Sequence, residues 1–479
     1  MNSKTNITKD FYWYFIGTAL PMLVLFFRSP IYTRIFSPEL FGKYSLIYIA
    51  FTYISALSYQ SITNNAWRYY NKYKKLTQLN LYMQVIVSLY ILIVITLFAG
   101  CSIWFMLTKD EMSRVLIFWG FFFALTNELF NTLNVPCRIE GYSKKYNLIN
   151  SGRAVFSFAL LLILTFIFDY TIEAFFISQV IANLLFVIPV LGNLPRINNR
   201  LKNSELKAHI FRFIKYGSAN LLFNIGLFLL ISSDRFVIAF IWGNEKVGIY
   251  NQTYNIAQMT IVAVFTVFNS VINPMLLEKL DTRPSTSNAF LVKLLTFSIV
   301  LFLPLTILLT QFSKEIVYVL LGEDFREAWN ILPYIFFSSL IYGITYFSEV
   351  KLKFQNQLKI LFRASLFCAL INISLNLIFV SKLGYKSAAY TTLISYFILM
   401  VILYRKSELK VFKHIDPKLI YKLIAVLGGL LLIDNYLLKA FLDFNIIIEA
   451  TIRITIFLGI YALFTVKEIR GFIKVFNGS

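Results

Sequence analysis

Long apolar runs dominate this sequence and restrict its possible folds more than any other feature. Fourteen of them are long enough, at about 20 residues each, to cross the hydrocarbon core of a bilayer as helices. Of the 479 residues, 58% are hydrophobic and only 14% are charged, more apolar surface than a water-soluble chain could bury. The sequence therefore predicts an all-α membrane protein with 14 transmembrane helices. The predicted spans are residues 11–29, 44–66, 79–107, 112–134, 146–168, 172–194, 211–231, 247–275, 288–312, 327–350, 360–381, 385–404, 416–438 and 444–466.

The distribution of positive charge predicts how these helices are oriented. There are 45 Lys and Arg against 24 acidic residues, a net charge of +21. In a soluble protein this excess would suggest nucleic acid as a partner. Here most of it falls in alternate loops, with dense clusters at residues 68–75, 196–215 and 405–422. By the positive-inside rule these loops are cytoplasmic, so we expect cytoplasmic N- and C-termini and no nucleic-acid binding.

A weak internal repeat groups the first twelve predicted helices into two sets. The pattern E-x-x-G-x-Y-x-x-x-Y at residues 39–48 recurs at residues 245–254, an offset of 206 residues. Arg-Ala followed by Ala-Leu at residues 153–160 recurs at residues 363–370, an offset of 210 residues. The two matches occur in the same order at nearly the same offset, so we interpret them as one duplication.

The repeat predicts a two-lobed architecture. Six crossings per repeat is an even number, so both copies insert in the same direction and are related by a pseudo-two-fold axis along the membrane normal. We expect an N-lobe of helices 1–6 in residues 1–206, a C-lobe of helices 7–12 in residues 207–412, and two C-terminal helices in residues 413–479. Bodies of this kind commonly alternate between inward-open and outward-open states. The pattern favours a transporter.

Amide side chains form stripes on several predicted spans. Asn127 and Asn131 share one helix face of span 4, and Asn251, Asn255 and Gln258 share one face of span 8. Amides in membrane bundles often only hydrogen-bond neighbouring helices. Stripes on different helices also favour a common polar cavity, wide enough for a hydrophilic molecule such as a sugar. These five amides are candidate substrate contacts.

Four arginines lie at or near membrane depth, where ionisable groups are rare and tend to be functional. Arg153 and Arg363 occupy equivalent places in the two repeats. Snorkelling to the interface is the alternative explanation for such residues. Arginine suits phosphate because its planar fork donates two hydrogen bonds at once. The candidate contacts for an anionic substrate group are Arg28, Arg153, Arg235 and Arg363.

Two acidic residues are candidates for ion coupling. Glu128 lies among Phe and Leu in span 4 and is the best placed carboxyl to exchange a proton. Asp234 closes span 7 and is followed by Arg235, so mutual pairing of these two residues is a structural alternative. An H⁺ or Na⁺ gradient, or the flux of substrate itself, would drive transport.

Motifs for nucleotide binding, metal binding and hydrolysis are missing from the sequence. It contains no G-x-x-x-x-G-K-[ST], H-E-x-x-H or G-x-S-x-G. Its three cysteines form no CxxC or Cys/His pattern, which argues against a zinc site and a disulfide framework. The predicted outside loops are short and hold no histidine, which disfavours a membrane-embedded polysaccharide polymerase or glycosyltransferase. We expect a protein that is not an enzyme and that holds no cofactor or metal.

Three stretches, in order, resemble the polysaccharide transporter family of the multidrug/oligosaccharidyl-lipid/polysaccharide exporter superfamily. The resemblance covers essentially the whole chain. The stretches are TRIFSPELFGKY at 33–44, SDR at 233–235 followed by VGIY at 247–250, and NISLNLIFV at 372–380 followed by GYKSAAYTT at 384–392.

The resemblance implies a flippase in the bacterial cytoplasmic (inner) membrane. Such a protein moves undecaprenyl-diphosphate-linked oligosaccharide repeat units to the outer leaflet by alternating access, for O-antigen, capsule or another surface polysaccharide. A cationic cavity receives the diphosphate and sugars, while the tail stays among membrane lipids. A polysaccharide polymerase and other assembly proteins are the expected partners.

Other functions stay open at this point. The nearest alternative is a lipid II or teichoic-acid precursor flippase, which would share the fold and differ in the head-group. A multidrug exporter is disfavoured because that branch typically has twelve spans. A non-catalytic scaffold for the assembly enzymes is a further alternative.

Overall fold

The regular structure of this chain is helical throughout the part that a computed structural model describes. That part comprises residues 17, 20, 21, 23, 24, 26–140, 142–192, 203–217, 221–282, 284–409, 416–438 and 446–477, and it contains no strand. The predicted all-α class is confirmed. The chain divides into two compact units, Met1–Gly248 and Ile249–Ser479. The predicted lobe boundaries mark sequence repeats rather than compactness, and they stay predictions.

The spans of the described chain confirm a multi-pass membrane protein. Eleven helices are long and apolar enough to cross a membrane, or twelve if a pair bent by 58° is one span. That pair is η3 (Glu323–Asn330) and α12 (Leu332–Phe354). One 46-residue apolar stretch, Asn224–Asn269, overlaps two predicted spans, 211–231 and 247–275. Most of predicted span 11–29 lies outside the described residues, so the total of fourteen stays a prediction.

The long helix α8 (Leu221–Ala257) is broken at Gly243. Gly243 has φ 81° and ψ 178°, a conformation that residues with a Cβ rarely adopt. Helix continues beyond the break and passes through a π-helical turn, η2 (Gln258–Val262), into α9 (Ala263–Thr282). At 1.5 Å per residue the 46-residue stretch is far longer than a bilayer core of about 30 Å. The stretch is therefore long enough for two spans, and the break at Gly243 lies in the loop that the sequence predicts between spans 7 and 8.

In the first unit, α4 is the central helix of the packing. It contacts α2, α3, α5 and α6. Its first turn is capped by Asp110, whose carboxylate accepts a hydrogen bond from Ser113 N at 2.9 Å. Ser37 caps α2 in the same way, ahead of a proline in the first turn. The helices are α2 (Pro38–Lys75), α3 (Leu79–Leu107), α4 (Glu111–Ile139), α5 (Ser143–Phe166) and α6 (Ala174–Leu191).

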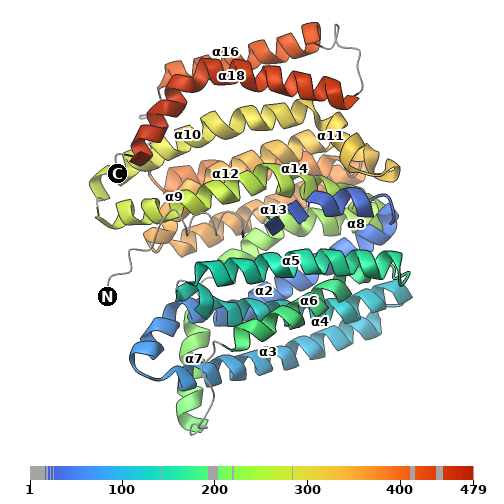
Figure 1. The fold of residues 1–479 in the computed structure, drawn as a ribbon, viewed down its shortest axis with the longest axis vertical. Helices are drawn as coiled ribbons and strands as arrows, with labels where there is room; N and C mark the ends of the chain where they lie inside the picture. The colour runs from blue at the N-terminus through green and yellow to red at the C-terminus, as the bar shows by residue number, and fades with distance from the viewer. Residues whose placement is uncertain are drawn as a thin grey trace. The chain divides into compact units, whose positions relative to one another are not determined.

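The short helix α7 (Asn203–Gly217) packs against α2 and α3. Figure 1 shows it crosswise to the long helices of the first unit. Phe213 is fully buried there and stacks on Tyr69 with 5.1 Å between ring centroids. Tyr73 Oη and His209 Nδ1 are 2.6 Å apart. These contacts fix α7 to the extended C-terminal end of α2.

The second unit repeats the neighbour pattern of the first. In the first unit α3 contacts α4, α4 contacts α5 and α6, and α5 contacts α6. In the second unit α10, α12, α13 and α14 take the places of α3, α4, α5 and α6 and make the same contacts. The pattern supports the duplication inferred from sequence. The remaining helices of this set are α10 (Pro284–Gln311), α11 (Ser313–Leu320), α13 (Leu358–Leu383) and α14 (Ser387–Lys406).

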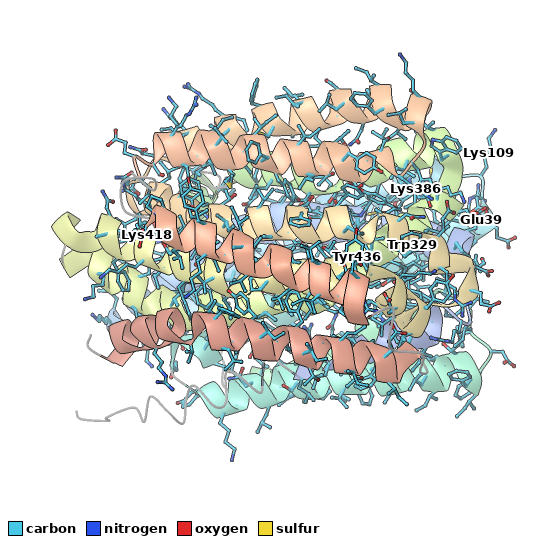
Figure 2. The ribbon with its side chains drawn as sticks, turned by 90° about the horizontal axis from the view of Figure 1, so that it is seen from above. Glu39, Lys109, Trp329, Lys386, Lys418 and Tyr436 are labelled. Carbon is cyan, nitrogen blue, oxygen red and sulfur yellow. The ribbon has the colours of Figure 1, made fainter. Side chains whose placement is uncertain are left out.

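The C-terminal helices form the outer layer of the second unit in Figure 1. They are α16 (Pro417–Leu432), η4 (Ile433–Leu438) and α18 (Ile446–Asn477), and they pack on α10 through buried Leu427 and Phe457. Arg453, 1% exposed, donates two hydrogen bonds to Asp434, each 2.6 Å long. This bidentate ion pair joins η4 to α18. Figure 2 shows Lys418 and Tyr436 at opposite ends of α16 and η4.

Candidate functional site

Arg153 lies at the centre of a polar cluster formed by three helices of the first unit. From α5, its Nη1 donates to Asn127 Oδ1 on α4 at 3.2 Å and to Asn183 Oδ1 on α6 at 2.8 Å. Asn183 is 2% exposed, and its Nδ2 donates to Thr126 Oγ1 at 3.2 Å. Because that bond fixes the amide, Asn183 turns its oxygen towards the guanidinium. Sequence reasoning had identified Asn127 but not Asn183.

The guanidinium of Arg153 is supported on its face as well as on one edge. Its central carbon lies 4.2 Å from the centroid of the Phe130 ring, a cation–π contact. The side chain is half-buried, and no hydrogen bond from its Nε or Nη2 occurs within the described chain. One edge of the fork is thus held by amides. The other edge has the two-donor geometry that binds carboxylate or phosphate.

Glu128 belongs to the same cluster. It is 8% exposed, and Asn127 Nδ2 donates to its Oε1 at 3.4 Å. The Asn131 amide also hydrogen-bonds its carboxyl, and Arg153 is near enough to interact with it electrostatically. The structure therefore brings together four residues that the sequence singled out: Asn127, Glu128, Asn131 and Arg153. Their proximity follows from the packing of α4 against α5 and α6.

Arg28 lies in an aromatic environment elsewhere in the first unit. Its guanidinium carbon is 4.2 Å from the ring centroid of Phe175 and 6.0 Å from that of Tyr32. Phe175, on α6, is buried and also packs against Phe36 and Tyr44. Cation–π contacts with these two rings stabilise the guanidinium. Arg28 and Arg153 therefore have different surroundings.

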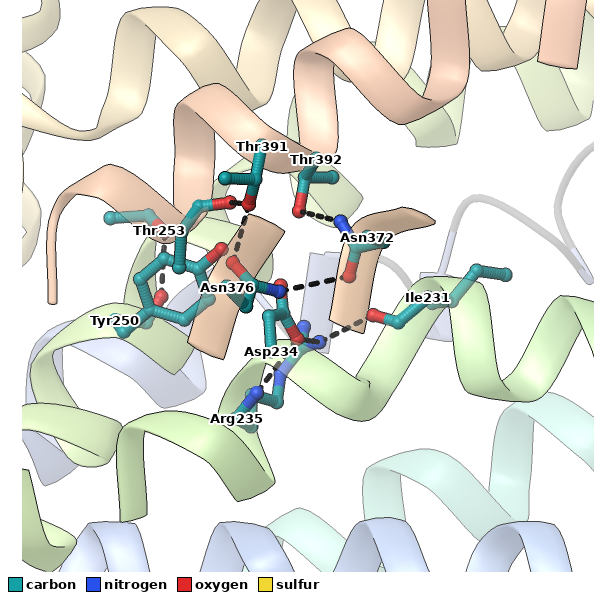
Figure 3. A network of polar contacts seen from close by, with 10 residues as sticks. Ile231, Asp234, Arg235, Tyr250, Thr253, Asn372, Asn376, Thr391 and Thr392 are labelled. Carbon is teal, nitrogen blue, oxygen red and sulfur yellow. Dashed lines mark hydrogen bonds and ion pairs between the residues drawn. The ribbon is translucent and has the colours of Figure 1, made fainter. Parts of the chain in front are cut away.

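Asp234 and Arg235 are buried on α8 and pair with each other. Arg235 Nη1 is 3.1 Å from Asp234 Oδ1 and 2.7 Å from the carbonyl oxygen of Ile231. Asp234 is 0% exposed and Arg235 is 5% exposed. Figure 3 shows these contacts. The pairing considered at the level of sequence is present, and a role for either residue in substrate binding or ion coupling stays a prediction.

Arg363 does not share the surroundings of its repeat partner. It lies on α13, the counterpart of α5, and its side chain is exposed. α14, the counterpart of α6, contains no asparagine that could hold Arg363 as Asn183 holds Arg153. The equivalence of Arg153 and Arg363 therefore holds for helix position and not for contacts.

A different polar network joins α13 to α14 in the second unit. Asn376 Nδ2 donates to Asn372 Oδ1 at 2.9 Å, and Asn372 Nδ2 donates to Ser395 Oγ at 3.3 Å. The Thr391 hydroxyl donates to Asn376 Oδ1 (Figure 3). Both asparagines are 0% exposed. The sequence signal for this network is a pair of asparagines spaced i, i+4 in an apolar run. In the sequence analysis this pair serves only as part of a family motif.

The amide stripe of span 8 falls on the segment of α8 that continues into η2. Asn255 Nδ2 donates to Gln252 Oε1 at 3.2 Å, within its own helix. Asn251 is half-buried, and Gln258 is exposed as the first residue of the π-helical turn. π-helical turns inside helices are often found at functional sites. The role of these three amides in substrate binding stays a prediction.

Comparison with solved structures identifies the fold. The chain is similar to the lipid II flippase MurJ in an inward closed conformation, with 17% identity and a TM-score of 0.73 over 96% of this chain and 99% of that chain. It is also similar to a MOP superfamily transporter from Pyrococcus furiosus, with 13% identity and a TM-score of 0.61 over 84% and 95%. A Vibrio cholerae MATE transporter gives 12% identity and a TM-score of 0.59 over 84% and 97%.

The fold is that of the transporters of the MOP superfamily. A family model described as polysaccharide biosynthesis protein matches residues 31–330, more than half of the sequence, and the chain belongs to that family. No curated protein sequence matches it. The resemblance drawn from the sequence motifs is confirmed at the level of family and superfamily.

Proposed function

We propose that this protein is a flippase for lipid-linked oligosaccharides. Its substrate would be an undecaprenyl-diphosphate-linked repeat unit, moved from the cytoplasmic to the outer leaflet of a bacterial inner membrane by alternating access. Membership of a polysaccharide biosynthesis family and the transporter fold support a non-enzymatic role in the assembly of a surface polysaccharide. O-antigen and capsule precursors are the substrates that the family membership favours.

The physical problem explains why such a protein needs a polar interior. A glycan and a diphosphate crossing hydrocarbon unaided would lose their hydration, at a cost of several kcal/mol for each polar group left unsatisfied. Amides and arginines that replace water remove much of that barrier. The lipid tail needs no such help and can stay among the acyl chains.

The open edge of Arg153 is the observation that carries the proposal. Its Nη1 is held by two amide oxygens, and within the described chain its Nε and Nη2 make no hydrogen bond, so they can donate to an anionic oxygen pair. We assign this edge to the diphosphate. Arg28, Arg235 and Arg363 are secondary candidates, because Arg28 faces aromatic rings, Arg235 is paired and Arg363 is exposed.

Ion coupling is part of the proposal. Glu128 is hydrogen-bonded to the amide that also holds Arg153, so a proton on Glu128 would change the charge balance beside the diphosphate contact. Asp234, the other candidate, is already paired with Arg235. Glu128 is therefore our preferred coupling residue, with H⁺ as the ion.

A lipid II flippase is the second candidate function. The fold similarity to MurJ, which spans nearly the whole of both chains, favours it. Both substrates carry a polyprenyl diphosphate, so the contact assigned to Arg153 serves either. The glycan part of the head-group distinguishes them.

The test is transport in proteoliposomes with each lipid-linked head-group in turn. We expect Arg153→Ala to lower the initial rate by about tenfold to a hundredfold, because a hydrogen bond to a charged group contributes roughly 1.5–3 kcal/mol. Arg153→Lys should restore only part of it, since lysine lacks the planar fork. Arg326→Ala, at a half-buried residue paired with exposed Glu323, is the control. Wild-type rates for well-folded Arg153→Ala would refute the assignment, and faster transport of lipid II would favour the second candidate.

A further inference from the structure

The two copies of the E-x-x-G-x-Y repeat contact each other through their glycines. A Cβ placed on Gly42 would lie 1.8 Å from the carbonyl oxygen of Asn244 and 3.0 Å from Gly248 N. A Cβ placed on Gly248 would lie 2.0 Å from the carbonyl oxygen of Pro38 and 3.1 Å from Gly42 N. Backbone therefore touches backbone at this point, and only residues without a side chain fit.

This contact is reciprocal. Gly42 meets the carbonyl four residues before Gly248, and Gly248 meets the carbonyl four residues before Gly42. Both the two glycines and the two carbonyl residues are 206 residues apart, the offset of the sequence repeat. A contact in which the same surface of both partners meets itself defines a local two-fold axis. The four contacting residues, at positions 38, 42, 244 and 248, belong to the first unit, so the axis is a property of that unit alone.

The contact lies at one end of the spanning helices. Gly42 is in the first turns of α2, far along that helix from its basic last turn, and Gly248 follows the Gly243 break in α8. The side chains beside the contact are exposed to solvent, Glu39 at 62% and Glu245 at 58%. By the predicted orientation, with the basic turn of α2 in the cytoplasm, this end faces outwards.

We propose that the Gly42–Gly248 contact is the outside gate of the transport cycle, closed in this structure. The proposal rests on the alternating access proposed above and adds the residues that seal its outer end. Glycines let two backbones approach closely enough to leave no path between them. Such a contact is held largely by van der Waals attraction, which is small for each atom pair, so it can part and re-form.

Substitution at either glycine has a predictable direction. The atoms that a new methyl group would meet are backbone atoms, which cannot rotate aside as a side chain could. Gly42→Ala and Gly248→Ala should therefore widen the contact and favour the outward-open state. Gly100 has nothing within 4 Å of its Cβ position, so Gly100→Ala is a matched control.

The gate can be measured as a distance in the full-length protein in liposomes, by electron paramagnetic resonance without added substrate. Spin labels are attached to Glu39→Cys and Glu245→Cys after the three native cysteines have been replaced by alanine. One short distance should dominate the parent. Either glycine variant should lower the ratio of short to long distances by roughly tenfold or more, as expected for an overlap that the site cannot relieve.

Two outcomes would overturn the proposal. The first is a distance distribution in Gly42→Ala and Gly248→Ala that matches the Gly100→Ala control. If the glycine variants do not fold, the second measurement uses native glycines: a cleavable cross-linker joins the thiols of the Glu39→Cys/Glu245→Cys protein. Linking should stop transport and cleavage should restore it, and transport that continues while linked contradicts the gate.

The design separates this inference from the proposed function. The distance measurement needs no lipid-linked oligosaccharide, so distances that shift as expected while no such lipid is transported would leave the gate standing and refute the substrate. Transport of the lipid-linked oligosaccharide with unchanged distances would support the substrate and refute the gate.

Discussion

At the scale of single residues, the arginine cluster depends on an amide that binds no substrate in our proposal. Asn183 holds Arg153 from α6 and is itself held by Thr126. We regard Asn183 as a positioning residue. In sequence it is a lone asparagine in an apolar span, indistinguishable from an amide that only joins two helices. Glu128 and Arg153 could be predicted because charged residues are rare in apolar spans, and Asn127 because it belongs to an amide stripe. Asn183, which holds the arginine, carries neither signal.

Replacing Asn183 by alanine should weaken the diphosphate contact although Arg153 itself is unchanged. We expect the half-saturating substrate concentration in proteoliposomes to rise by about twofold to twelvefold, because a guanidinium that Asn183 no longer holds must be ordered on binding. The maximal rate should change less. Asn150→Ala is the control, since the Asn150 amide donates to the Tyr146 carbonyl of its own helix. Unchanged half-saturation in the Asn183 variant would remove its positioning role.

At the scale of elements, the end of α2 beyond its membrane span is held to the end of α4. Lys74 Nζ lies 2.7 Å from Glu140 Oε1, and the Tyr70 hydroxyl donates to the same oxygen. The Lys74 ammonium, with the Tyr70 hydroxyl, holds the pKa of Glu140 below its ordinary value. Glu140 follows the last residue of α4, so this contact lies outside the spans.

The lowered pKa gives this contact a defined pH dependence. A glutamate in an unfolded chain titrates near pH 4.3, so the stabilisation is complete above about pH 4.3 and is lost as the pH falls from there through the lower pKa of the folded protein. Glu140→Gln should lower the free energy of unfolding at pH 7 by up to about 1 kcal/mol, because Lys74 is half exposed. Thermal unfolding in detergent should show the difference shrinking in acid. Glu323→Gln, at an exposed residue, is the control.

At the scale of the whole molecule, apolar length and charge asymmetry predicted the multi-pass helical fold without any structural information. They were less informative about where helices end. The helix of predicted span 7 continues past residue 231 to Gly243, where non-helical backbone separates it from predicted span 8. The sequence pattern of one helix also does not specify which residues of the neighbouring helices it contacts. For this reason the sequence did not predict that Arg153 is held by Asn183 while Arg363 has no equivalent partner on α14.

The predicted orientation can be tested at Lys74, which lies in the most basic turn of α2 and is 49% exposed. A Lys74→Cys variant in intact cells should be closed to a membrane-impermeant maleimide and should react once the cells are opened. Glu39→Cys, at the other end of α2, should react in intact cells and serves as the positive control. Rapid labelling of the Lys74 position from outside would reverse the topology and place the glycine contact in the cytoplasm.

The reciprocal glycine contact also restricts how the duplicated halves can diverge. After a duplication, one copy can usually drift while the other keeps the original role. Here each copy presses on the backbone of its sister, so a side chain gained by either one disturbs both. The two halves can therefore carry different arginines and amides along their helices, whereas at this one point both require glycine.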